Sequence, residues 1–180
     1  MTTLVFIAGL TVETFSPAEQ YATSPRNLGR QEIERLIGLG RAAGSGPLPR
    51  FIRAAADVAQ RDPEGVRLVF IVERAANDDG RGHELIDAVR EYARDADVIE
   101  TPRGTLPWRQ IVEIASVPAS PDTDRTLDRP SRALITGAHT ELGIKSLATA
   151  LNSPFSIDSV AVCPHLVGSS TREAHLAALR

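Results

Sequence analysis

Residues 132–175 constrain the fold more than any other stretch, because two strand-like runs there are each followed by a turn and a helix. The runs Ala133–Thr136 and Val160–Val162 are short and aliphatic, as buried strands are. The turns fall around Gly137 and Gly168. Strands that alternate with helices form βαβ units, so we expect both turns at the carboxyl edge of one parallel sheet, where α/β folds hold their ligands.

The rest of the chain continues this alternation. Further strands are predicted at residues 3–8, 67–73 and 96–100, and further helices at 30–42, 48–60, 85–92 and 108–115. Three stretches rich in Pro, Gly and polar residues are predicted loops or turns: 10–30, 77–82 and 117–130. The sequence thus predicts one α/β domain over residues 1–180, with three α/β/α layers and a mainly parallel, doubly wound, Rossmann-like sheet of about five or six strands.

Composition excludes several classes of function. No apolar run approaches the roughly 20 residues that span a bilayer, so no membrane partner is expected. The net charge is −3 and no cluster of basic residues with interleaved aromatics occurs, so no nucleic-acid partner is expected. The N-terminal residues lack the basic start of a signal peptide, and the single cysteine, Cys163, fits a reducing compartment. A cytoplasmic location is therefore predicted.

The two turns have a functional and an ordinary interpretation. A helix predicted to start near Glu141 would present backbone N–H groups with partial positive charge, which suit an anion or an oxyanion. Ser170 and Glu173 have the spacing of a capping box, which predicts the start of the last helix. The ordinary interpretation is that both turns simply connect strands to helices, as in any α/β protein.

Taken together, these residues resemble the isochorismatase-like superfamily, also called the cysteine hydrolases. That family has a strand, the motif Gly-x-x-Thr, a cysteine three residues on, a helix of small residues, and a later helix with His and Ala-Leu. Residues at matching spacings are Gly137, Thr140, Ile144, Ala148 and the run His175–Leu179. The resemblance covers residues 132–180 and implies a six-stranded, mainly parallel sheet that often assembles into oligomers.

The chain departs from that family at all three catalytic positions. Gly143 stands where the family has its nucleophilic Cys, and Ala8-Gly9-Leu10 stands where it has Asp. The only lysine, Lys145, follows the strand that the family's lysine precedes, and Arg103 cannot shuttle a proton as a tuned lysine does. True isochorismatases resemble this chain in having Gly for Cys, but they keep the Asp as general acid.

Weak candidates for replacement chemistry remain. Carboxylates that would act as acid or base are Glu13, Glu73 and Glu100. Cys163 and His165 lie two apart, on one face if the strand is regular, and would form a nucleophile and base. The alternative for Cys163 is a buried, inert thiol, which is the common state of cysteine.

Ligand-binding candidates lie around the first turn, and they are Gly137, His139, Thr140 and Gly143. His139 and His165, both expected to follow strands, would bind a metal if Glu73, Glu100 or Glu141 joined them. No compact spacing such as His-x-x-x-His occurs, so no metal and no cofactor is predicted. His175 is expected to cap or pack the last helix.

Three functions stay open on the sequence. The first is a degenerate hydrolase, a pseudoenzyme that binds a small molecule or serves as a subunit of a homo-oligomer or partner of an active paralogue. The second is a hydrolase of a vinyl ether or an amide that uses substituted acid and base residues, with the amides near Gly143 as an oxyanion site. The third is a plain oligomeric interaction module.

Overall fold

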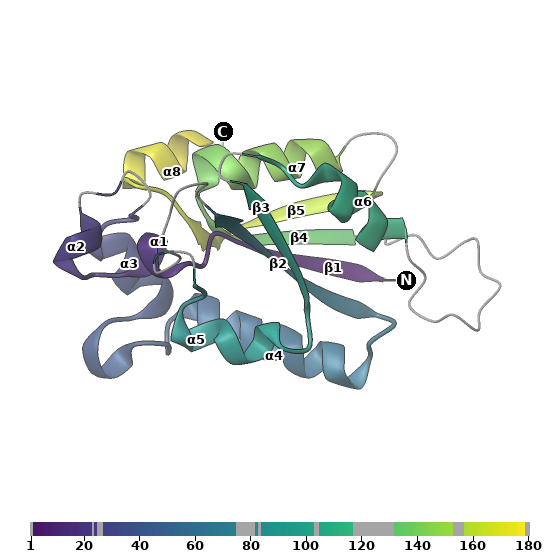
Figure 1. Cartoon of the computed structure of the whole chain (residues 1–180), viewed down its shortest axis with the longest axis horizontal. Helices are drawn as coiled ribbons and strands as arrows, with labels where there is room; N and C mark the ends of the chain where they lie inside the picture. The colour runs from purple at the N-terminus through teal and green to yellow at the C-terminus, as the bar shows by residue number, and fades with distance from the viewer. Residues whose placement is uncertain are drawn as a thin grey trace.

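A computed structural model describes residues 2–22, 24, 27–74, 82, 84–102, 105–116, 132–152 and 157–178. It contains five parallel strands in the order β3-β2-β1-β4-β5 (Figure 1). The strands are β1 (Thr3–Ala8), β2 (Val66–Arg74), β3 (Asp97–Pro102), β4 (Arg132–Ala138) and β5 (Ser159–Gly168). The predicted doubly wound parallel sheet is confirmed.

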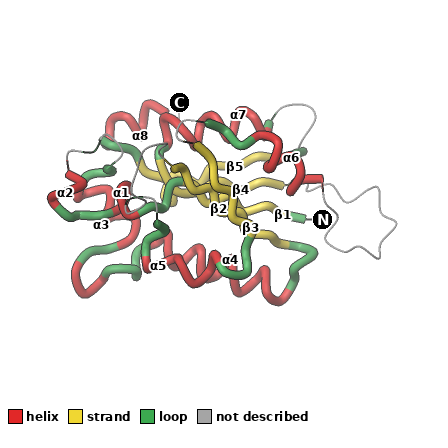
Figure 2. The backbone as a smooth tube through the Cα atoms, in the orientation of Figure 1, coloured by secondary structure: helices red, strands yellow, loops and turns green. Residues whose placement is uncertain are grey.

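Helices cover both faces of this sheet, and Figure 2 shows the strands between two helical layers. One layer holds α3 (Arg30–Ile37), α4 (Pro47–Arg61) and α5 (Asp87–Arg90), with the short helices η1 (Gly40–Ala42) and η2 (Glu91–Ala93). The other holds α6 (Trp108–Ser116), η3 (Thr140–Ile144) and α7 (Lys145–Leu151). At the carboxyl end of the sheet lie α1 (Val12–Phe15), α2 (Glu19–Ala22) and α8 (Arg172–Ala178) (Figure 1). None of the described helices is long and apolar enough to cross a membrane.

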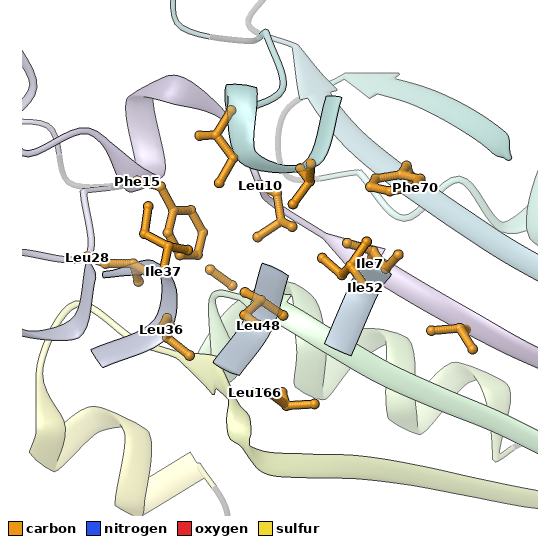
Figure 3. Close-up of a cluster of buried hydrophobic side chains, with 14 of the residues drawn as sticks. Ile7, Leu10, Phe15, Leu28, Leu36, Ile37, Leu48, Ile52, Phe70 and Leu166 are labelled. Atoms are coloured by element: carbon orange, nitrogen blue, oxygen red, sulfur yellow. The ribbon is translucent and has the colours of Figure 1, made fainter. Parts of the chain in front are cut away.

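The strand β1 is buried on both faces, which explains why its sequence is apolar without alternation. Val5 and Ile7 pack in the core under α4, together with Phe70 of β2 and Ile52 of α4 (Figure 3). The intervening residues of β1 pack in the second core, under α6 and α7. Each fully buried aliphatic or aromatic side chain of this kind contributes about 1.5–3 kcal/mol to folding.

Two sequence-based predictions of element boundaries are wrong. The segment 10–30, predicted as a loop, contains α1 and α2, whose single turns are too short to produce a periodic apolar pattern. The last strand, predicted over 160–162, continues to Gly168. It does so through an irregularity, because Ile135 pairs with Val162 whereas Gly137 pairs with Val167.

The last helix begins one residue later than its predicted capping box. The backbone N–H of Ala174 donates to Thr171 Oγ1 over 3.1 Å, so Thr171 and not Ser170 is the N-cap. Loop 117–130, Arg103 and most of the turn 77–82 lie outside the described residues.

Candidate functional site

The strand order places the candidate site between β1 and β4. The connections from β1 to β2 and from β2 to β3 pass over the face that carries α4 and α5, whereas the later connections pass over the face of α6 and α7. The winding direction of the sheet therefore reverses between β1 and β4. In open α/β sheets such a switch point, at the carboxyl ends of the strands, is where ligands bind.

Two glycines bring the ends of β1 and β4 into close contact. Gly9 has a φ of +67° and Gly137 a φ of +109°, a region that residues with a side chain rarely adopt. A Cβ atom on Gly9 would lie 2.4 Å from the carbonyl oxygen of Ala138, and one on Gly137 would lie 2.0 Å from that of Ala8. Neither position accepts a side chain on this backbone. Gly137 lies within β4, paired with Ala8, and not in the turn where the sequence placed it.

The residues on either side of Gly9 are apolar and buried. Leu10 is fully buried and lies in the core with Phe15 and Ile7 (Figure 3). Ala8 is buried against the second core. The end of β1, where the family resemblance places an aspartate, thus consists of packed backbone and apolar side chains.

Position 143, by contrast, has room for a side chain. The helix predicted to start near Glu141 begins as the π-helical turn η3, in which the N–H of Ile144 donates to the carbonyl of His139 over 3.1 Å. Among the described residues outside its own helical turn, the nearest heavy atom to a Cβ on Gly143 would be the carbonyl oxygen of Ala138, 4.0 Å away. Gly143 is partly exposed and its φ is not positive. Packing therefore does not exclude a nucleophile here, although the chain has none at this position.

Thr140 and His175 form a buried polar pair behind this turn. The hydroxyl of Thr140 lies 3.0 Å from the carbonyl oxygen of Gly168 and 3.1 Å from Nδ1 of His175. A carbonyl only accepts, so Thr140 donates to Gly168 and His175 Nδ1 donates to Thr140. This pair ties the ends of β4 and β5 to α8. The expectation that His175 packs the last helix agrees with this arrangement.

Ser169 follows Gly168, the residue whose carbonyl oxygen accepts the hydrogen bond from Thr140. Its side chain is fully buried, and among the described residues its Oγ has no hydrogen-bond partner. A buried hydroxyl in that state costs about 1–3 kcal/mol of desolvation.

A Ser169→Ala variant should therefore be as stable as the parent or more stable by up to about 1 kcal/mol, measured by urea unfolding. The matched change Thr140→Val should cost about 1–3 kcal/mol, because it removes the donor to Gly168 and the acceptor for His175. A loss for Ser169→Ala as large as that for Thr140→Val would show that the Ser169 hydroxyl is bonded in solution.

The three candidate carboxylates, of Glu13, Glu73 and Glu100, do not share one face of the sheet. Glu73 continues the alternation of Ile71 on β2, so it lies on the face of α6 and α7. Glu100 lies on the opposite face, half exposed and paired with Arg74. Glu13 lies on α1, where its Oε1 accepts a hydrogen bond from the hydroxyl of Ser24 over 2.7 Å. Of these carboxylates, the register puts Glu73 on the sheet face that carries the helix of Gly143.

Cys163 and His165 lie before the end of β5, so the prediction that His165 follows its strand is wrong. Cys163 is partly buried and packs against the core under α4, whereas His165 is exposed. Both fall in the irregular part of β5, where regular alternation does not apply. Neither lies at the carboxyl edge where the site was expected.

An ion pair on α3 holds this irregular stretch. Arg35 donates to Glu32 through Nε over 3.1 Å and through Nη2 over 2.6 Å. The same guanidinium donates to the carbonyl oxygens of His165, over 3.2 Å, and Val167, over 2.8 Å. The Glu32 side chain is 8% exposed and that of Arg35 is 29% exposed. Arg35 thereby joins α3 to the last residues of β5.

No metal site is formed by the residues that the structure describes. Among them, no group of three His, Cys, Asp or Glu side chains lies close enough to bind an ion. His139 follows β4 and is buried, whereas His165 is exposed on β5. The two histidines of the donor set considered from the sequence therefore lie in different environments, one after β4 and the other within β5.

Sequence reasoning missed the Arg35–Glu32 pair and the contact between Thr140 and His175. Glu32 and Arg35 are three apart on a helix, a spacing that favours pairing, but nothing local indicates that β5 lies beside them. Thr140 and His175 are both among the residues that match the family pattern. That shared match was the indication in the sequence that the two side chains could lie together.

Comparisons with known proteins bear on the fold. Neither a scan of protein-family models nor a search of curated proteins finds a match. An isochorismatase-like hydrolase from Alkaliphilus metalliredigens superposes with a TM-score of 0.68 and 14% identity, over 99% of this chain and 87% of that chain. A nicotinamidase from Bacillus subtilis superposes with a TM-score of 0.62 and 16% identity, over 99% of this chain and 93% of that chain. A pyrazinamidase of Pyrococcus horikoshii, in complex with zinc, superposes with a TM-score of 0.57 and 12% identity, over 99% of this chain and 93% of that chain. The chain therefore has the three-layer fold of isochorismatase-like hydrolases and nicotinamidases.

Proposed function

We propose that the chain is a non-catalytic relative of the isochorismatase-like hydrolases, which binds a small molecule in a crevice at the carboxyl ends of β1 and β4 or works as a subunit beside an active partner. The observation that carries this proposal is the contact of Gly9 with Ala138. It leaves no space for a side chain at Gly9, the middle residue of the Ala8-Gly9-Leu10 stretch where the resemblance expects the general acid, and Ala8 and Leu10 on either side are apolar and buried.

Two further observations support the proposal. Gly143 supplies no nucleophile, and the only lysine, Lys145, is exposed on α7, where it does not replace the family's lysine. The open position at Gly143 and the buried pair of Thr140 with His175 are the parts of the scaffold that a binding site would use. Loss of acid and nucleophile together removes chemistry without removing the fold.

The test combines turnover and binding on the full chain. Isochorismate and nicotinamide should not be converted faster than in a protein-free control. Nicotinamide should nevertheless give a saturation-transfer NMR signal, and Gly143→Phe, which fills the open position, should abolish it. Turnover of either substrate would contradict the proposal, and absence of nicotinamide binding would contradict its small-molecule form.

A second candidate is a hydrolase in which Glu73 replaces the missing acid or base. It is favoured by the register of β2, which puts Glu73 on the sheet face that carries the helix of Gly143. If this candidate is correct, turnover of either substrate is measurable and falls at least about 100-fold in Glu73→Gln. Glu100→Gln is the matched control, because Glu100 lies on the opposite face, paired with Arg74. Equal rates in the two variants would rule the candidate out.

The third function that the sequence leaves open is an oligomeric interaction module. The mass of the assembled protein is the measurement that tests it. A dimer or larger assembly that binds neither probe would favour it over a small-molecule binder.

A further inference from the structure

A concavity lies at the end of the sheet opposite the candidate site. It is bounded by α4, by η2 and by the first residues of β2 and β3, among them Val66 and Asp97. Its volume is about 570 Å³. Pockets that hold small molecules usually measure about 300–1,000 Å³, so this hollow is large enough for an aromatic or short aliphatic ligand.

Small apolar side chains form part of the lining of this hollow. Ala56 and Ala59 of α4, Leu68 of β2 and Ala96 form its apolar lining. Ala56 and Leu68 are buried, and Ala59 and Ala96 are partly buried. Alanine on α4 leaves space beside β2 that a larger residue would fill. This part of the hollow favours an apolar body in the ligand.

The charged side chains that line the hollow are mostly acidic. Arg67 is the one cation among them, and it is neutralised by Asp97, whose Oδ2 accepts from Nη2 over 2.9 Å. Arg67 also donates to the carbonyl oxygen of Ile114 over 3.2 Å. Glu91 and Asp95, both exposed, are the other acidic residues of the lining. The lining therefore has a net negative charge.

Tyr92 adds an aromatic surface to this acidic rim. Its hydroxyl accepts a hydrogen bond from Nε of Arg53 over 2.9 Å, a contact that raises the pKa of Arg53. Arg53 lies close enough to Glu91 to interact with it electrostatically, but it is not part of the lining. Tyr92 is one of the residues that line the hollow, and it also packs against the core under α4. An aromatic face beside carboxylates attracts organic cations.

We propose that this hollow, between α4, η2 and the starts of β2 and β3, binds an organic cation with an apolar body, such as an aromatic amidine or amine. Its apolar lining would take the body of the ligand, and Glu91 and Asp95 would face the cationic group. This site is separate from the crevice of the proposed function, and it holds whether or not that crevice binds anything.

Three probes of one shape test the charge requirement: benzamidine, which is cationic, benzamide, which is neutral, and benzoate, which is anionic. Ligand-observed NMR on the full chain should show the tightest binding for benzamidine and none for benzoate. The double change Glu91→Gln with Asp95→Asn should weaken benzamidine binding at least about tenfold, and both residues are exposed enough for the fold to tolerate it.

Two further variants locate the binding. Asp57→Asn removes an exposed carboxylate of α4 outside the hollow, so it should leave benzamidine affinity unchanged. Gly143→Phe should also leave it unchanged, because it blocks only the crevice between β1 and β4. Equal binding of benzoate and benzamidine, full affinity in the double variant, or loss in Gly143→Phe would each overturn the proposal, as would no benzamidine binding.

Discussion

A Gly137→Ala variant is expected to lose at least about 3 kcal/mol of unfolding free energy, or to fail to fold. The added Cβ would lie 2.0 Å from the carbonyl oxygen of Ala8, a backbone atom that cannot rotate away. The φ of +109° adds strain for any residue with a side chain. Relief requires β1 and β4 to separate at the middle of the sheet. Urea unfolding followed by circular dichroism measures the loss.

The matched control is Gly143→Ala, five residues from the end of β4 at Ala138. No heavy atom of the described residues outside this turn lies closer than 4.0 Å to the new Cβ, and glycine within a helical turn costs about 0.5–1 kcal/mol relative to alanine. This variant should be as stable as the parent or slightly more stable. Comparable losses in the two alanine variants would mean that the close approach of β1 and β4 does not exist in solution.

The second large effect is expected for Arg35→Ala, which should cost about 3 kcal/mol. The change leaves the buried carboxylate of Glu32 without its cation and removes the donors to the carbonyls of His165 and Val167. The packing of α3 on the end of β5 should weaken as well. Amide hydrogen exchange should show faster opening of α3 and β5 than of β1 and β2.

Two changes test whether the effect belongs to this arrangement. Glu32→Gln should cost less than Arg35→Ala, because Arg35 is partly exposed and keeps its two carbonyl acceptors. Arg90→Ala removes an arginine whose ion pairs with Glu84 and Asp87 are exposed, so it should stay within about 1 kcal/mol of the parent. If Arg90→Ala costs as much as Arg35→Ala, burial of the pair is not the cause.

Most of the fold could be predicted from the sequence, because burial on both faces leaves a visible signal. The apolar run at β1 and the run at β2 read directly as strands of a parallel sheet. The continuation of β5 past Val162 could not be predicted, because Pro164 and His165 interrupt the apolar pattern. The strand resumes its pairing with β4 at Val167, and Arg35, which is far away in the sequence, donates to the carbonyl oxygen of His165 in the interrupted stretch.

The candidate site was less predictable than the fold. The sequence shows that Gly143 stands where a nucleophile is expected and that Gly9 lies within the stretch Ala8-Gly9-Leu10 where an acid is expected, but it gives both glycines the same appearance. Only the spatial approach of β1 to β4 separates a position that has no space from one that has. Likewise, alternation places Glu73 and Glu100 on opposite faces only once the register of β2 with β3 is known.

The close contact of Gly9 with Ala138 also bears on how such a chain can change over time. A carboxylate cannot be installed at position 9 by one substitution, since any Cβ there would meet the Ala138 carbonyl at 2.4 Å. The backbone of β1 or β4 would have to shift first, and a shift without the carboxylate brings no catalytic gain. Substitution at Gly143 needs no such shift, because a Cβ there would lie 4.0 Å from the carbonyl oxygen of Ala138, its nearest described neighbour outside its own helical turn.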